Sequence, residues 1–249
     1  MSQNKRGQYV PCENCPWRRS GVFRPIPPAA LVALGRFKKD HIHVPARRTL
    51  VRPSGQHSVF YTLFDGWAFG YANVNGNRQI LHFYVPGDVI GVQIPLLGAV
   101  TCTVQTLTDA SLCVFACDKV EALFETQPRL GLEIARIAAA ESMLIRMRLA
   151  AIGRREAVAR VAYLLAELHA RLKQRRLWQG DGCVLPLTQE HFADALGLST
   201  VHISRMFKVL GDDGIARFER GRLTILDLQA LHERAELDGG FGLAEPSLL

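Results

Sequence analysis

The segment from residue 186 to residue 227 places two short helices around a glycine turn and follows them with a strand pair. Thr188 and Ser199 are typical N-cap residues, because their hydroxyl groups can accept hydrogen bonds from the unpaired amides of a first helical turn. Gly197 permits the left-handed backbone that ends the first helix. The E-R-G-R sequence at 219–222 favours a tight turn between two strands. This order of parts predicts a winged helix-turn-helix unit.

The second helix of this unit is predicted to have one buried and one exposed face. Ile203, Phe207 and Leu210 recur at helical spacing and form the apolar stripe. The opposite face is suited to the major groove of DNA, because arginine can donate two parallel bonds to guanine and valine can contact a thymine methyl. The predicted DNA-binding residues are Ser199, Thr200, Val201, His202, Ser204, Arg205, Lys208, Arg220 and Arg222.

From about residue 42 to residue 116 the sequence changes to short β-rich runs separated by turn residues. Asn75-Gly76 is a strong hairpin signal, since both central positions of such a turn favour positive φ. Runs at this spacing predict a small antiparallel sandwich or barrel. A short helix is expected before it, within 26–37. A second one is expected after it, with Asp118 as N-cap and Glu121 as its capping-box partner.

A long helix is predicted from residue 128 to residue 153. Residues along it alternate at steps of four and three, which is the spacing of a coiled-coil seam, so a partner helix is expected. The alternative is a helix packed on its own domain. Glu141 and Arg148 would set the register of a pair. The predicted dimer-interface residues are Leu130, Ile134, Ile137, Glu141, Leu144 and Arg148.

Composition and charge restrict where such a chain can act. No apolar run approaches the about 18 residues that cross a bilayer, and the first ten residues lack the apolar stretch of a signal peptide, so we expect a cytoplasmic protein with reduced thiols and no membrane partner. Residues 1–52 hold eleven basic residues against two acidic ones. This basic region either keeps the protein in solution or faces nucleic acid or an acidic partner protein.

With "PGDVIG" in the β-rich region, a long helix and then "LTQEHFADALGLSTVHISRMFKVLGDDGI", the chain resembles the CRP/FNR family of bacterial transcription regulators over nearly its whole length. The resemblance implies a homodimer on a two-fold symmetric site of double-stranded DNA, with an effector sensed in a β-roll. RNA polymerase is a further expected partner, for which the basic region is a candidate surface.

The expected fold class is α+β: an N-terminal antiparallel β-roll of the cyclic-nucleotide-binding type, a long dimerisation helix and a C-terminal winged helix-turn-helix. The expected domains are a cysteine-containing basic arm at 1–24, a sensor domain at 25–127, the dimerisation helix at 128–153, a DNA-binding domain at 154–236 and a tail at 237–249.

Two departures from the family's pattern affect the effector and the DNA site. Members that hold cyclic AMP carry a glutamate after the glycine of a "GE" motif and an Arg-Ser pair further on. This chain has Gly91-Val92 and no arginine before the next strand, so cyclic AMP is not the expected effector. The family's usual glutamate on the second helix is Val201 here, which predicts a DNA half-site that differs at the corresponding base pair.

FNR-like members bind a four-iron four-sulfur cluster, and the resemblance assigns Cys12, Cys15 and Cys113 to such a site. The position of the remaining N-terminal ligand is Gly21, so another group would have to complete the set. The residues that could do so are Cys102, Cys117, His41 and His43, and a non-protein ligand is the remaining choice. A redox or oxygen-related signal is therefore expected, with an iron-sulfur cluster as the implied cofactor.

Other uses of the cysteine pair stay open. The pair could bind zinc with His41 and His43. It could act as an oxidation switch beside Arg18 and Arg19. In a further alternative the cysteines are inert and an unidentified small molecule binds in the β-roll. An enzyme is not expected, because no cysteine, histidine and acid lie on a suitable turn and no glycine loop is shaped to cradle phosphate.

Overall fold

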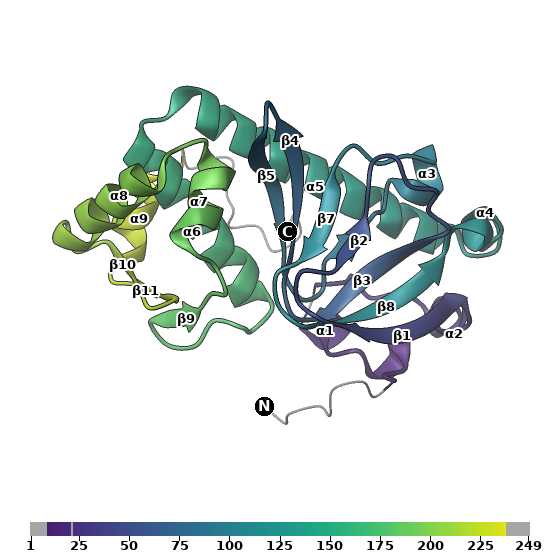
Figure 1. Ribbon diagram of the computed structural model, residues 1–249. Helices are drawn as coiled ribbons and strands as arrows, with labels where there is room; N and C mark the ends of the chain where they lie inside the picture. The colour runs from purple at the N-terminus through teal and green to yellow at the C-terminus, as the bar shows by residue number, and fades with distance from the viewer. Residues whose placement is uncertain (1–8, 21, 238–249) are drawn as a thin grey trace. The chain divides into compact units, whose positions relative to one another are not determined.

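The computed structural model describes residues 9–20 and 22–237 of the chain. The chain divides into two compact units. The first contains the residues up to Ala72 together with His82–Glu141, and the second contains Asn73–Leu81 together with the residues from Ser142 onward. Figure 1 shows both units and labels most of their helices and strands.

Two four-stranded sheets form the framework of the first unit. Their neighbouring strands follow the orders β1-β8-β3-β6 and β2-β7-β4-β5. The pairings β1–β8, β3–β8, β3–β6, β2–β7 and β4–β7 are antiparallel. The strands are β1 (Lys38–Val44), β2 (Thr49–Val51), β3 (Val59–Asp65), β4 (Ala68–Val74), β5 (Asn77–Tyr84), β6 (Val89–Ile90), β7 (Thr103–Thr106) and β8 (Ala110–Ala116).

The predicted hairpin at Asn75-Gly76 is confirmed. It joins β4 to β5, and its two central residues have φ values of 50° and 79°. Glycine adopts positive φ without a steric penalty and asparagine adopts it more readily than most residues, so the dipeptide selects this tight turn.

Apolar side chains from both sheets meet between them in one core. Leu63 of β3 and Leu112 of β8 have no exposed surface, and they pack in a cluster with Val51, Tyr84 and Val104 of the other sheet. Because side chains alternate along a strand, the residues next to them in sequence point to the opposite face of their sheet. The second face of β1-β8-β3-β6 is therefore available for a different set of contacts.

Short helices cover parts of the first unit. They are η1 (Cys12–Asn14), α1 (Pro16–Arg19), α2 (Pro28–Phe37), α3 (Ile94–Leu97), η2 (Cys117–Lys119) and α4 (Val120–Thr126). The short helix expected within 26–37 is α2, which begins on a proline as first helical turns permit. The expected cap at Asp118 is wrong. A 3-10 turn occupies Cys117–Lys119, and α4 begins after Lys119 without a side-chain cap bond.

The predicted long helix is α5 (Pro128–Arg154). Three side chains of its predicted seam are buried by contacts within the chain, since Leu130, Leu144 and Arg148 are only 4%, 5% and 3% exposed. The other three, Ile134, Ile137 and Glu141, are half-buried. Arg148 forms an ion pair with Glu167 and donates to the carbonyl oxygen of Leu81 at 2.7 Å. This burial matches the alternative of a helix packed on its own domain.

Glu141, the other polar residue of that seam, is also satisfied within one copy of the chain. It accepts hydrogen bonds from the Tyr84 hydroxyl group at 3.1 Å and from the Gln93 side chain at 3.0 Å. Both bonds lie inside the first unit.

The second unit has the predicted helix-turn-helix order. Its elements are the end of α5, α6 (Ala157–Gln174), β9 (Gly182–Val184), α7 (Gln189–Leu196), α8 (Thr200–Asp212), β10 (Ala216–Glu219), β11 (Arg222–Ile225) and α9 (Leu228–Arg234). The rings of Phe192, Phe207 and Phe218 meet at centroid distances of 5.1–5.2 Å and tie α7, α8 and β10 together. The three-stranded sheet β10-β11-β9 completes the unit.

The predicted fold class is confirmed: two antiparallel sheets form a β-roll, a long helix follows, and a winged helix-turn-helix ends the described chain. Among the described residues, no helix is both long and apolar enough to cross a membrane.

Candidate nucleic-acid interface and a cavity beneath the N-terminal arm

Side-chain caps fix the start of both helices of the helix-turn-helix. The hydroxyl oxygen of Thr188 accepts from the backbone N–H of His191, and the His191 ring accepts from the backbone N–H of Thr188 at 3.0 Å. This reciprocal pair is a capping box with histidine in the place of glutamate. Ser199 accepts from the backbone N–H of His202 at 3.2 Å, and Gly197 ends α7 with a φ of 64°. The turn between the helices is therefore specified at each step.

The two predicted faces of α8 are present. Ile203 and Leu210 are fully buried and Phe207 is 7% exposed. Within the described part of the chain, the cationic side chains of Arg205 and Lys208 have no hydrogen-bonding or ion-pair partner, so both are available to a ligand. The predicted DNA-binding residues of this helix and its cap are all exposed: Ser199, Thr200, Val201, His202, Ser204, Arg205 and Lys208.

The wing is the hairpin of β10 and β11. Arg220 and Gly221 at its tip have φ values of 49° and 79°, which are the positive values that a tight hairpin turn requires. Arg220 and Arg222 are both exposed, as predicted. Arg222 is paired with Asp181 at 3.1 Å, so Arg220 is the less encumbered cation of the wing.

A contact that the sequence reasoning missed anchors α7. The tip of the β4–β5 hairpin, Asn73–Leu81, belongs to the second unit. Arg78 at this tip donates to Asp194 at 2.6 Å and to Glu190 at 3.4 Å, and the Gln79 side chain donates to the carbonyl oxygen of Ala195 at 3.2 Å. These partners lie more than a hundred residues apart in sequence, so no local pattern could reveal them.

In the first unit, the outer face of sheet β1-β8-β3-β6 carries sulfur and aromatic side chains. Thr62 pairs with Cys113 and Phe60 with Phe115 across β3 and β8. They alternate with Leu63 and Leu112, which point into the core, and therefore face outward.

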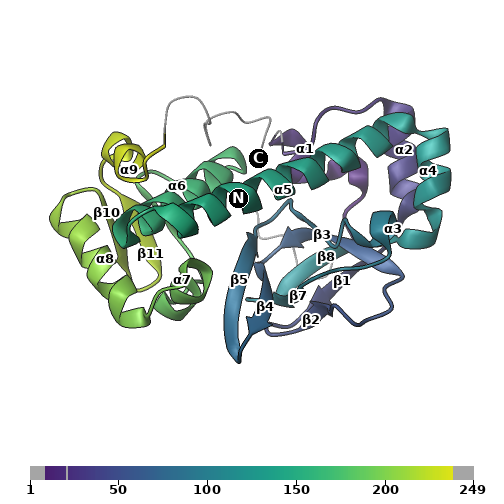
Figure 2. The same cartoon turned by 90° about the horizontal axis from the view of Figure 1, so that it is seen from above.

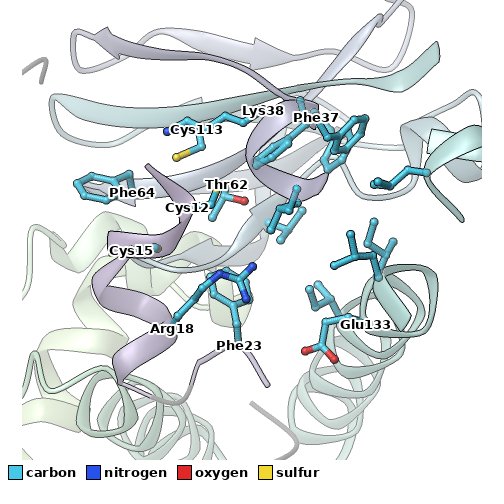
Figure 3. A pocket seen from close by; sticks show the side chains of 18 of the residues that line it. Cys12, Cys15, Arg18, Phe23, Phe37, Lys38, Thr62, Phe64, Cys113 and Glu133 are labelled. Atoms are coloured by element: carbon cyan, nitrogen blue, oxygen red, sulfur yellow. The ribbon is translucent and has the colours of Figure 1, made fainter. Parts of the chain in front are cut away.

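The N-terminal arm covers this outer face. The indole N–H of Trp17 donates to the carbonyl oxygen of Phe64 at 2.9 Å, and the Lys38 ammonium donates to the carbonyl oxygen of Val10 at 2.8 Å. These bonds hold the arm on the sheet, and they bury Cys12 to 9% exposure. Figure 3 shows Cys12 and Cys15 of the arm on the side of the sheet to which the Cys113 thiol points.

A β-bulge directs Lys38 toward this site. The register between β1 and β8 shifts between Lys38 and Asp40, so Lys39 is an extra residue. In a regular strand, residues three apart point to opposite faces. The bulge instead places Lys38 on the same face as His41, with 3.3 Å between Nζ and Nδ1.

A cavity of about 90 Å³ lies between the arm, the outer face of the sheet and the helices α2, α4 and α5. Figure 2 shows α1, α2 and α4 beside the first part of α5. Aromatic and aliphatic side chains form most of the lining. The polar and sulfur-bearing lining residues are Cys12, Cys15, Arg18, Lys38, Thr62, Cys113 and Glu133.

The structure thus brings the three predicted cysteine ligands to one cavity. Cys102, Cys117, His41 and His43 are not among its lining residues. In the described part of the chain, no three Cys, His, Asp or Glu side chains are arranged to hold a metal ion. The donor set present therefore does not fit the four thiolates of an iron-sulfur cluster, nor a zinc site with the two histidines.

Burial holds the thiols of Cys12 and Cys113 in their uncharged form. Burial raises the pKa of Cys113 to about 11, against a smaller opposing effect of the Lys38 charge. Burial also raises the pKa of Cys12, and the cations Lys38 and Arg18 oppose it in part. The pKa of His41 is lowered by burial and then by Lys38. An apolar environment with neutral sulfur atoms results.

Alkylation of Cys113 tests this environment, because only the thiolate reacts. In the native protein the labelling rate should rise with pH until about pH 11, whereas in the denatured chain it should level off above the ordinary pKa of 9.0. The sign follows from the raised pKa: the stability that the buried thiol contributes is complete below pH 9.0 and is lost as the pH rises through about 11. Mass spectrometry of the Cys113 peptide measures both curves. A native midpoint at the denatured value would contradict burial of this thiol.

Known protein domains match the sequence of both units. Residues 41–127 match the model of the cyclic nucleotide-binding domain, and residues 159–234 match that of the Crp-like helix-turn-helix domain. The nitrogen fixation regulation protein FixK of Bradyrhizobium diazoefficiens is 27% identical over 87% of this chain and 90% of its own length. The transcriptional activator protein FnrL of Cereibacter sphaeroides is 27% identical over 93% of this chain and 94% of its own.

The structure of FixK2 from Bradyrhizobium japonicum has the same fold. It superposes with a TM-score of 0.71 at 23% identity and covers 82% of this chain and 98% of its own. The domain models, the relatives and the fold agree: the chain belongs to the CRP/FNR family of transcription regulators, with relatives in the FNR-like branch.

Proposed function

We propose that the chain acts as a cytoplasmic homodimer that binds a two-fold symmetric DNA site through α8 and activates transcription by RNA polymerase. The observation that carries the proposal is the exposed face of α8, where Arg205 and Lys208 have no partner among the described residues and lie opposite the buried apolar stripe. Several relatives are named as transcriptional activators, which supports activation as the outcome.

The chemistry of the exposed face assigns a role to each end of α8. Ser199 and Thr200 lie at the helix N-terminus, where unpaired amides and the helix dipole favour phosphate. Arg205 is placed to donate two bonds to guanine, and Val201, 60% exposed, can contact a thymine methyl group. His202, Lys208 and the wing residue Arg220 are assigned to phosphate contacts.

Replacement of Arg205 by alanine tests the reading face. In a fluorescence titration of a DNA site selected from random sequence, we expect affinity to fall by about ten- to a hundredfold, since one bidentate base contact contributes about 1–3 kcal/mol. Preference at one base pair of each half-site should relax as well. Arg129→Ala, which removes an exposed arginine from the first turn of α5, should bind as the wild type does. Unchanged affinity and base preference in Arg205→Ala would remove this assignment.

The dimer needs an α5 surface that one copy of the chain leaves open. The interface predicted from sequence, Leu130 to Arg148, is largely engaged within the chain. An adjacent stripe with the same alternating spacing is open: Leu132 and Leu149 are 51% and 69% exposed. Small residues between them allow close approach of a second helix. The spacing of the stripe matches the 3.5-residue period of a coiled coil. Its members are Leu132, Ala135, Ala139, Ser142, Arg146 and Leu149.

Ala139→Glu places a carboxylate at the centre of this stripe. We expect the dimer Kd to rise by about a hundredfold or more, because an unpaired charge would be buried between the helices. Analytical ultracentrifugation measures the shift. Ala122→Glu, on the exposed surface of α4, should leave the association unchanged. If both variants associate as the wild type does, the dimer uses another surface.

The interior of the β-roll supports an effector other than cyclic AMP. Glu141 projects a carboxylate that Tyr84 and Gln93 hold by hydrogen bonds. Burial, and then this carboxylate, raises the pKa of the Cys102 thiol to about 11. A carboxylate does not complement a cyclic phosphate, and Gly91-Val92 offers no acid for the ribose hydroxyl group.

A redox or oxygen-related signal stays a prediction, and the three thiols at one cavity support it. Because the described donors do not fit a cluster, we expect protein purified without oxygen to be colourless and free of iron, zinc and acid-labile sulfide. Metal and sulfide analysis with an absorbance spectrum decides this, with Cys12→Ala as the matched control. Iron and sulfide that are present in the wild type and lost in the variant would establish a cluster with an unusual fourth ligand.

A further inference from the structure

We propose that the cavity beneath the N-terminal arm binds a small apolar carboxylate, a single-ring or short-chain acid, with its carboxylate group held by Arg18. The cavity lies on the outer face of the sheet, away from the β-roll interior. Four features carry the assignment: the size of the cavity, its apolar walls, the state of its two cations and its position against α5.

Size limits the ligand to a few heavy atoms. The cavity measures about 90 Å³, which is less than the about 150 Å³ of an apolar protein cavity that accepts benzene, so a ligand with a ring must extend beyond the enclosed space. Arg18, Cys15 and Glu133 are only half-buried, so the cavity reaches the surface beside them and one end of a ligand can extend toward solvent. A single ring or a short chain with a polar end matches this shape.

The walls favour an apolar ligand body. Phe37, Phe60 and Phe115 pack against one another with centroid distances of 5.4–6.1 Å, which makes a preformed aromatic wall. Ile134 and Ile137 of α5 line the other side. Water between the aromatic wall and these isoleucines meets apolar side chains on both sides, so an apolar ligand body displaces it favourably.

Only one of the two cations at the cavity is available to an anion. Lys38 is engaged by the carbonyl oxygen of Val10 at 2.8 Å, by His41 at 3.3 Å and by the thiol of Cys113. Arg18 lies over the ring of Phe23 at 5.3 Å, and its guanidinium group has no hydrogen-bond acceptor within the described residues. Figure 3 shows Arg18 beside Phe23 at the cavity. A guanidinium group in this state is a bidentate site for carboxylate.

The acid at the cavity does not oppose this assignment. Glu133 accepts the backbone N–H of Arg24 at 3.3 Å and lies 3.6 Å from the Arg136 guanidinium group. The charge of Glu133 is therefore balanced by these two partners. The neutral thiols of Cys12 and Cys113 add polarizable lining atoms without adding charge.

An effector role for this ligand rests on the proposed function. Glu133, Ile134 and Ile137 line the cavity from α5, and Leu132, Ala135 and Ala139 of the proposed dimer stripe lie on the same helix. A ligand that packs against α5 would favour one placement of that helix and so bias dimerisation and DNA affinity.

Isothermal titration of the full chain with sodium benzoate and sodium hexanoate tests the site, with benzyl alcohol as the uncharged probe. We expect the acids to bind, and Arg18→Gln to weaken their binding by about tenfold or more while leaving benzyl alcohol unchanged. Arg24→Gln, a matched loss of charge on the same arm, should bind as the wild type does. No binding of either acid, or equal losses in the two variants, would overturn the proposal.

A second variant keeps the test independent of the arm. Thr62→Leu adds bulk on the sheet at the cavity floor and should abolish binding of the acids and of benzyl alcohol alike, with unfolding curves confirming that each variant is folded. Retained binding in Thr62→Leu would place the ligand elsewhere and overturn the assignment.

DNA titration with and without benzoate separates the two proposals. If benzoate binds with the expected dependence on Arg18 but DNA affinity does not respond, the site stands and the effector role fails. Loss of DNA binding under all conditions would count against the proposed function alone.

Discussion

The sheet β1-β8-β3-β6 buries side chains on both of its faces, and the organisation of the first unit follows from that. Antiparallel sheets commonly leave one face to water. Here β8 is buried almost throughout, from Ala110 to Phe115. Leu112 belongs to the core between the sheets, while Cys113 and Phe115 belong to a second layer under the arm. Strand alternation therefore divides a single run of six residues between structural packing and a candidate binding site.

A buried group of charged side chains constrains the packing of the helices in the second unit. Glu167 of α6 has no exposed surface and pairs with Arg148 of α5 and with Arg171 one turn further along α6. Removing one member of such a group costs about 3–5 kcal/mol, because an uncompensated charge is left in the interior. The ion pair between Glu167 and Arg148 adds little net stability. Its main effect is to specify how α5 and α6 pack against each other. An arginine at a heptad position is explained here without a second copy of the chain.

The helix-turn-helix could be predicted from sequence because its signals are local. Thr188, Gly197 and Ser199 each act within a few residues, and the structure has all three in the expected roles. The seam of α5 shows the limit of such reasoning. Periodicity identifies which side of a helix is buried, and it does not identify the surface that buries it. At Asp118 a 3-10 turn displaced the helix start, which propensity alone does not resolve.

The site residues that sequence reasoning missed depend on contacts across long stretches of chain. Lys38 faces the cysteines only because Lys39 is an extra residue in β1, and no propensity marks that bulge. Arg78 reaches α7 across 116 residues of sequence. The convergence of Cys12 and Cys15 with Cys113 was expected through family resemblance. The Lys38 ammonium and the aromatic wall beside them were not.

The arm that closes the cavity also determines when the cavity can form. Its contacts join Trp17 to Phe64, and Arg24 to Glu133 across 109 residues. During synthesis the arm is made before β8 and α5, so it has no surface to dock on until β8 and the start of α5 have been made. Closing so long a loop of chain costs conformational entropy, which the contacts of the arm must repay. The cavity therefore requires the arm, β8 and the start of α5 together, and no contiguous stretch of the chain could form it alone.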